Sequence, residues 1–147
     1  MTTRRKMTTL ALTVSLLLAT AVAALAAGAG NGFKVRVAVP FEFQVGDAVL
    51  PAGEYTIERM TNVSVLMVRN VETRQTVKMA ITGGVKRGHD EVLLTFNRYG
   101  DRTFLKQVID GRNEVSYFLS RSGAERDAEK LLAERNARPQ LVSLVVR

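Results

Sequence analysis

The stretch LTFNRYGDRTFLKQV, residues Leu94 to Val108, predicts two β-strands joined by a tight turn. Alternating apolar and polar residues flank the pair Gly100-Asp101, and glycine adopts the positive φ that a two-residue hairpin turn requires at no steric cost. With this pair as the turn, Phe96 lies opposite Leu105. A slip of one residue would turn every side chain to the other face of the sheet, so we interpret the Gly-Asp pair as the turn that sets the register.

The same register also predicts the pairs farther from the turn, provided that it runs without interruption. Val92 then lies opposite Ile109 on the apolar face, and Thr95 lies opposite Lys106 on a half-polar face. This partition favours a hairpin with one face toward a hydrophobic core.

Several basic and aromatic residues gather near one end of the hairpin. Four of them could hold a phosphate or a uronic acid by charge and stacking: Arg98, Tyr99, Arg102 and Lys106. The alternative, which we favour, is that basic residues on an exposed strand discourage edge pairing and aid solubility.

A period of two residues continues through most of the chain. It first appears from Phe33 to Val39, where valines alternate with Lys34 and Arg36, and Pro40 then marks an edge or a corner. Gly46-Asp47 predicts another hairpin turn, and TGGVKRGHD, residues 82–90, is expected to be a loop in which the glycines supply flexibility. We expect further strands at residues 41–45, 54–60, 63–68, 76–81, 115–119 and 141–146, the last of them buried within the sheet system.

The period changes after Ser120, which predicts one helix near residues 123–137. Ser122 and Glu125 form a capping box, in which the hydroxyl and the carboxylate would each accept a hydrogen bond from an otherwise unpaired backbone N–H. The expected apolar face of the helix consists of Ala124, Ala128, Leu131 and Leu132.

These elements predict a mainly β fold, an antiparallel β-sandwich or small barrel of about eight strands with one C-terminal helix. At 147 residues the chain is long enough for one ordinary core. We expect a single β-rich domain at residues 33–147 and a flexible junction at residues 27–32.

Residues 1–26 have the three-part pattern of a secretory signal peptide. Arg4, Arg5 and Lys6 precede a hydrophobic stretch that ends in the small residues of Ala24-Leu25-Ala26. We therefore expect an exported protein, periplasmic or extracellular; an uncleaved membrane anchor is the alternative, and the paired arginines leave the twin-arginine route open. Three of the 21 basic residues and none of the 14 acidic residues leave with the signal, so the net charge falls from +7 to +4. Export and this modest charge argue against a nucleic-acid partner.

The composition excludes several classes of catalytic and metal site. The chain has no cysteine, which rules out disulfides, zinc-thiolate sites and cysteine nucleophiles, and its one histidine, His89, has no paired ligand in the sequence. Asp90 and Glu91 are neighbours in an extended segment and would point apart, which does not suit an acid and base pair. Ser122 lacks a nucleophile-elbow motif. We predict no catalytic residue, no metal and no cofactor.

Three segments together resemble a family of small exported bacterial β-rich proteins: VPFEFQVGDAVLPAGEYTI (residues 39–57), the hairpin quoted above and SRSGAER (residues 120–126). The pattern is Val-Pro-Phe-x-Phe, Leu-Pro-Ala-Gly-x-Tyr, Tyr-Gly-Asp and Ser-x-x-Glu-Arg. Residues 141–146 have no counterpart in it. The resemblance implies an exported β-rich protein and no catalytic residues, since no activity is assigned to the family.

These observations favour a non-enzymatic envelope protein, either structural or a binding module, with an anionic envelope polymer or another protein as its partner. One alternative is a small barrel that carries an apolar ligand, which would require a residual internal cavity. The other is a hydrolase, which would require two carboxylates facing each other in one cleft.

The export hypothesis predicts a shortened chain. When the gene product is made with its own N-terminus in an exporting bacterial host, the soluble protein should begin at Ala27, as measured by intact mass. A chain that still begins at Met1 and stays in the membrane fraction would establish the anchor instead.

Overall fold

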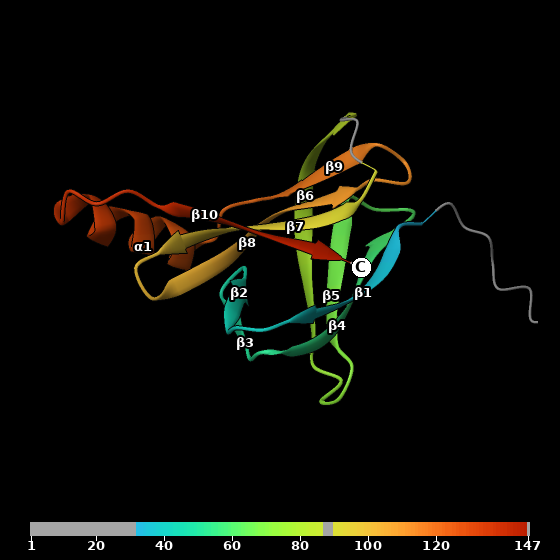
Figure 1. Ribbon diagram of the computed structural model, residues 1–147, viewed down its shortest axis with the longest axis horizontal. Coiled ribbons are helices and arrows are strands. Elements are labelled where there is room, and N and C mark those ends of the chain that lie inside the picture. Colours follow the sequence, from blue (N-terminus) through green and yellow to red (C-terminus); the bar gives the residue numbers. More distant parts are fainter. Residues whose placement is uncertain (1–31, 87–89, 147) are drawn as a thin grey trace, which may run out of the picture.

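A computed structural model describes residues 32–86 and 90–146 of the chain (Figure 1). The predicted signal, almost all of the predicted junction and His89 lie outside these residues. The described part is mainly β, with ten strands and one helix. The elements are β1 (Lys34–Val39), β2 (Phe43–Val45), β3 (Ala48–Leu50), β4 (Gly53–Met60), β5 (Val65–Asn70), β6 (Thr76–Lys86), β7 (Val92–Tyr99), β8 (Arg102–Asp110), β9 (Val115–Leu119), α1 (Gly123–Glu134) and β10 (Gln140–Val146).

The strands form two layers that share β6. The first half of β6 pairs with β5 and continues the order β1-β4-β5, whereas its second half pairs with β9 and leads to β8, β7 and β10. The strands of the first layer run steeply across those of the second in Figure 1. The predicted mainly β fold with one C-terminal helix is confirmed. The sheet is not closed into a barrel, and it has ten strands instead of about eight.

The β2–β3 hairpin connects the two layers. Pro40 lies at the corner after β1, as the sequence predicted, and the chain then passes to β2, which meets β8 through one parallel pair, Gln44 with Phe104. Gly46 has a φ of +63° in the turn between β2 and β3, which confirms the second predicted hairpin.

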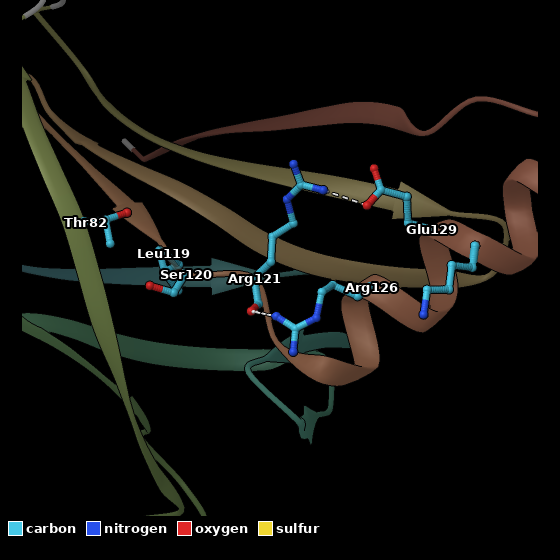
Figure 2. Close-up of a pocket in the computed structure, with 7 residues that line it drawn as sticks. Thr82, Leu119, Ser120, Arg121, Arg126 and Glu129 are labelled. Atoms are coloured by element: carbon cyan, nitrogen blue, oxygen red, sulfur yellow. Dashed lines mark hydrogen bonds and ion pairs between the residues drawn. The ribbon is translucent and has the colours of Figure 1, made fainter.

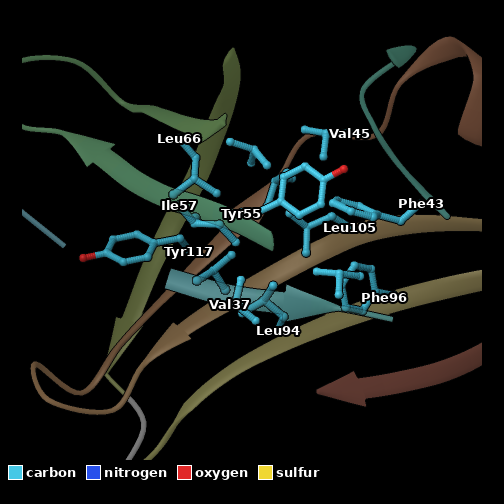
Figure 3. Close-up of a cluster of buried hydrophobic side chains, with 14 of the residues drawn as sticks. Val37, Phe43, Val45, Tyr55, Ile57, Leu66, Leu94, Phe96, Leu105 and Tyr117 are labelled. Carbon is cyan, nitrogen blue, oxygen red and sulfur yellow. The ribbon is translucent and has the colours of Figure 1, made fainter. Parts of the chain in front are cut away.

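Large side chains fill the space between the layers (Figure 3). The Phe43 ring packs edge-on against Tyr55 at 5.0 Å and against Phe96 at 5.6 Å between ring centres. Strand β1 has the predicted alternation: Val37 and Val39 are buried, and Lys34 and Arg36 are exposed. Fully buried side chains at the centre are Val45, Leu50, Tyr55, Ile57, Leu66, Val68, Leu94, Phe96 and Val108.

The β7–β8 hairpin keeps the predicted register only near its turn. Tyr99 pairs with Arg102 and Phe96 with Leu105, but a bulge then shifts the pairing by one residue. An uninterrupted register would place the polar side chain of Gln107 opposite Leu94 in the core; the bulge brings Val108 there instead.

Two predicted pairs are therefore wrong. Thr95 lies opposite Gln107 rather than Lys106, and Ile109 lies opposite Leu93 rather than Val92. Burying an apolar residue opposite Leu94 stabilises the fold more than an uninterrupted pairing of the two strands would.

Strand β6 is longer than predicted, because residues 82–86 of the expected loop belong to it. Gly83, with a φ of +77°, lies where the pairing between β6 and β9 shifts. Its role is a positive φ at a bulge, not loop flexibility.

Two predictions for the C-terminal region are also wrong in part. Strand β10 pairs only with β7 and is an edge strand, and the Leu141 and Val145 side chains are 63% and 41% exposed. Helix α1 ends earlier than expected, and Leu131 is 53% exposed although Ala128 is buried on the predicted face. No helix in the described residues is long and apolar enough to cross a membrane.

The conformation of the hairpin turn predicts that substitution of Gly100 lowers the stability of the protein. Its φ is +66°, and an added Cβ would meet no atom within 4 Å, so a substitution acts through the backbone alone. Gly100→Val should lower the free energy of unfolding by about 1–2 kcal/mol, because a left-handed conformation is costly for an L-residue. Gly100→Asn is the control and should cost less, since asparagine tolerates this region. Equal stability of both variants and the wild type in denaturant titrations would contradict this account.

Candidate functional site

The largest hollow that we describe lies where the chain leaves β9 and enters α1 (Figure 2). It has a volume of about 560 Å³, and its charged lining residues are Arg121, Arg126, Glu129 and Lys130. A second hollow of about 290 Å³ shares Arg121 and Glu129 with it and adds Lys106 from β8. We call the two hollows together the helix cleft.

The start of α1 is held by two side chains from different parts of the chain. The Ser122 hydroxyl accepts a hydrogen bond from the Glu125 N–H at 3.1 Å, as predicted for an N-cap. Asp47, in the β2–β3 turn, accepts a second one from the Ala124 N–H at 3.1 Å. These bonds hold the first turn of α1 near the β2–β3 turn, and the apolar side of the helix packs on Tyr99 of β7 and Phe104 of β8.

The predicted capping box is only half formed, because the Glu125 carboxylate serves another purpose. It is 5% exposed, and its Oε1 atom accepts hydrogen bonds from the Tyr99 hydroxyl at 3.1 Å and from the Asn97 amide at 3.2 Å. This contact ties α1 to β7. Burial, followed by the adjacent Glu125 charge, raises the pKa of Tyr99 to about 12.

The basic residues of the helix cleft are only partly neutralised by its acidic residues. Arg121 pairs with Glu129 at 2.6 Å between Nη1 and Oε2, and this pair lines both hollows. Arg126 donates to the backbone oxygen of Arg121 at 3.1 Å, as Figure 2 shows. Four basic residues and two acidic ones line the cleft, an excess of two positive charges.

The four residues predicted near the hairpin end are not all together. Arg98 packs over the Phe41 ring, 5.8 Å from its centre, and donates to the Thr103 hydroxyl. Arg102 lies over the Phe104 ring and donates to Gln44.

Tyr99 and Lys106 both line the helix cleft, whereas Tyr99 and Arg102 line a separate hollow of about 360 Å³ near the turn. Alternation along β7 places Arg98 on the opposite face from Tyr99.

Sequence reasoning missed the contribution of α1 to a cleft. Arg126 and Lys130 are one helical turn apart, a spacing that places them on one side of a helix. Both lie off the predicted apolar face of the helix, and nothing in the sequence indicates that they share a hollow with Leu119 and Arg121.

Comparisons with family models, curated proteins and solved structures gave no match. The resemblance to the exported β-rich family therefore stays a prediction, and the helix cleft must be interpreted from its own chemistry.

That chemistry does not include a recognisable catalytic constellation. Glu125 and Glu129 line one hollow, but they lie one turn apart on the same helix and each is already bound by another side chain. They do not face each other across a gap, as a carboxylate pair acting on a substrate would. Among residues 32–86 and 90–146, no group of three or more histidine, aspartate or glutamate side chains is arranged to hold a metal ion.

The Tyr99–Glu125 contact predicts a loss of stability at alkaline pH. The pKa of Tyr99 is raised from 10 to about 12 in the folded protein, so the unfolded chain releases this proton first. The stabilisation is complete below pH 10 and is lost as the pH rises through 12. Tyr99→Phe should flatten this decline, measured as the free energy of unfolding between pH 9 and 12.

Part of the decline should remain in the variant, because burial also raises the pKa of Tyr117. An identical pH dependence in Tyr99→Phe and the wild type would contradict the contact.

Proposed function

We propose that the protein is an exported, non-enzymatic binding module of the bacterial envelope, and that its helix cleft holds an anionic polymer. The observation that carries this proposal is the excess positive charge of the cleft. Arg121 is paired with Glu129 inside it, and Lys130 lies 4.0 Å from Asp127, which is outside the lining. With Glu125 and Glu129 both counted against the four basic residues, the lining keeps an excess of two positive charges. Guanidinium and ammonium groups bind phosphates and carboxylates through charge-assisted hydrogen bonds.

The extended form of the cleft favours a polymer over a single small ion. Its two hollows share the Arg121–Glu129 pair in their lining, and their basic residues come from β8, the β9–α1 connection and α1. Successive anionic groups of one chain could therefore contact Lys106 in one hollow and Lys130 in the other. Binding of this kind weakens with salt, because mobile ions screen exposed charges.

The two alternative functions have less support. A carrier of an apolar ligand needs internal space, but the region between the layers is occupied by completely buried side chains such as Tyr55, Ile57 and Leu66. The hydrolase alternative rests on two carboxylates that face each other across a gap, whereas Glu125 and Glu129 lie one turn apart on α1.

The proposal predicts that binding depends on two cleft residues and not on total charge. Arg126→Gln with Lys130→Gln should weaken the binding of a uronic-acid polymer or of polyphosphate by about tenfold, the loss of roughly 1.4 kcal/mol. The control is Arg69→Gln with Lys78→Gln, which removes the same charge from exposed positions on β5 and β6 and should change the affinity little. Affinities are measured by titration calorimetry at low and high salt.

Equal losses in both double variants would show attraction by net charge alone. A wild-type protein that binds neither polymer at low salt would favour a purely structural role or a protein partner.

A further inference from the structure

A second site lies at the end of the sandwich, where an arginine occupies a core-facing position. Along β4, Tyr55 and Ile57 point between the two layers and are completely buried. Arg59 follows at the same spacing of two residues and therefore also points inward. It is half-buried, which is unusual because arginine is rarely placed on the core face of a strand.

The contacts of Arg59 leave part of its hydrogen-bonding capacity unused. Its guanidinium carbon lies 5.6 Å from the centre of the Tyr117 ring on β9, a cation–π distance. Its Nε atom is buried and donates to no partner in the part of the chain that the structure describes. Within the same residues no carboxylate lies within ion-pair distance of Arg59. A buried N–H donor without a partner costs free energy, which an acceptor bound beside it would offset.

The exposed part of Arg59 lines a pocket of about 320 Å³ between the two layers. Ser64 and Tyr117 give it two further hydroxyl groups, and Ile81 and Val115 form its apolar walls. We call this hollow the Arg59 pocket. It shares none of its lining residues with the helix cleft.

The bulge in β6 helps to keep the pocket open. Gly83 and Gly84 line it without side chains, and a Cβ added at Gly84 would come within 3.6 Å of Val115 on the facing strand β9. A larger residue at this position would therefore take up space in the pocket.

We propose that the Arg59 pocket binds a small organic monocarboxylate, with the carboxylate on the Arg59 guanidinium and the apolar part against Ile81 and Val115. The planar guanidinium matches the two oxygens of a carboxylate. The pocket offers one cation, which balances one negative charge, and it has no second cation in its described lining for a phosphate dianion. Its volume is at the small end of the range for ligand pockets.

Tyr117 supplies a neutral donor for the same ligand. Burial raises the pKa of this hydroxyl, and the nearby Arg59 charge acts in the opposite direction. The hydroxyl keeps its proton at neutral pH and can donate it to a carboxylate oxygen.

Binding of three probes by the purified protein tests this proposal. Benzoate should bind, and benzamide, which has the same shape but no charge, should bind at least tenfold more weakly in titration calorimetry. Inorganic phosphate should bind more weakly than benzoate. Absence of benzoate binding, equal affinity for benzamide, or tighter binding of phosphate would each overturn the assignment.

Variants distinguish a ligand site from a structural arginine. Arg59→Met should reduce benzoate affinity at least tenfold while the melting temperature stays equal or rises, because an unpaired buried donor is removed. Arg69→Met on the exposed face of β5 is the matched control and should bind benzoate as the wild type does.

Arg59→Lys keeps the positive charge near Tyr117 but lacks the planar guanidinium with its paired N–H donors. This variant should fold normally and bind benzoate several-fold more weakly than the wild type. Wild-type affinity in Arg59→Met or Arg59→Lys would overturn the proposal. Because the helix cleft is not altered, polymer binding should be the same in all three variants.

Discussion

The architecture depends on one strand, β6, that belongs to both layers of the sandwich. Its first half completes the layer with β5, and from Ile81 onward it pairs with β9. The bulge with the positive φ of Gly83 follows two residues later, within the half of β6 that pairs with β9. Ile81, where the partner changes, and Gly83 and Gly84 at the bulge all line the Arg59 pocket. The pocket therefore lies where β6 passes from one layer to the other.

The helix cleft has a different origin, the attachment of α1 to the hairpin. Glu125 accepts hydrogen bonds from Tyr99 and Asn97, and this buried contact determines where the following turns of the helix lie. Arg126 and Lys130 thereby line one hollow together with Arg121 and with Leu119 at the end of β9. Glu125 was predicted to complete the capping box, but it instead attaches α1 to β7 and so positions the charged residues of the helix cleft.

Much of the fold could be predicted because it follows from local rules. The period of two along β1, the positive φ of Gly46 and Gly100, and the N-cap at Ser122 all depend on residues that are neighbours in the chain. The errors arose where the structure depends on packing between strands that are far apart in the sequence. The bulge in β8 follows from what can be buried opposite Leu94, which the turn does not reveal.

The sequence by itself determined the strand periodicity, the two hairpin turns and the position of the helix start, because each depends on short-range backbone preferences. Only the tertiary structure decided which charged residues share a cleft. Arg98 and Tyr99 are adjacent in sequence and point to opposite faces of β7, whereas Lys106 on β8 and Arg121 after β9 line the same hollow. Side chains on a pleated strand alternate between faces, so the neighbours of a charge are set by strand order and packing rather than by distance along the chain.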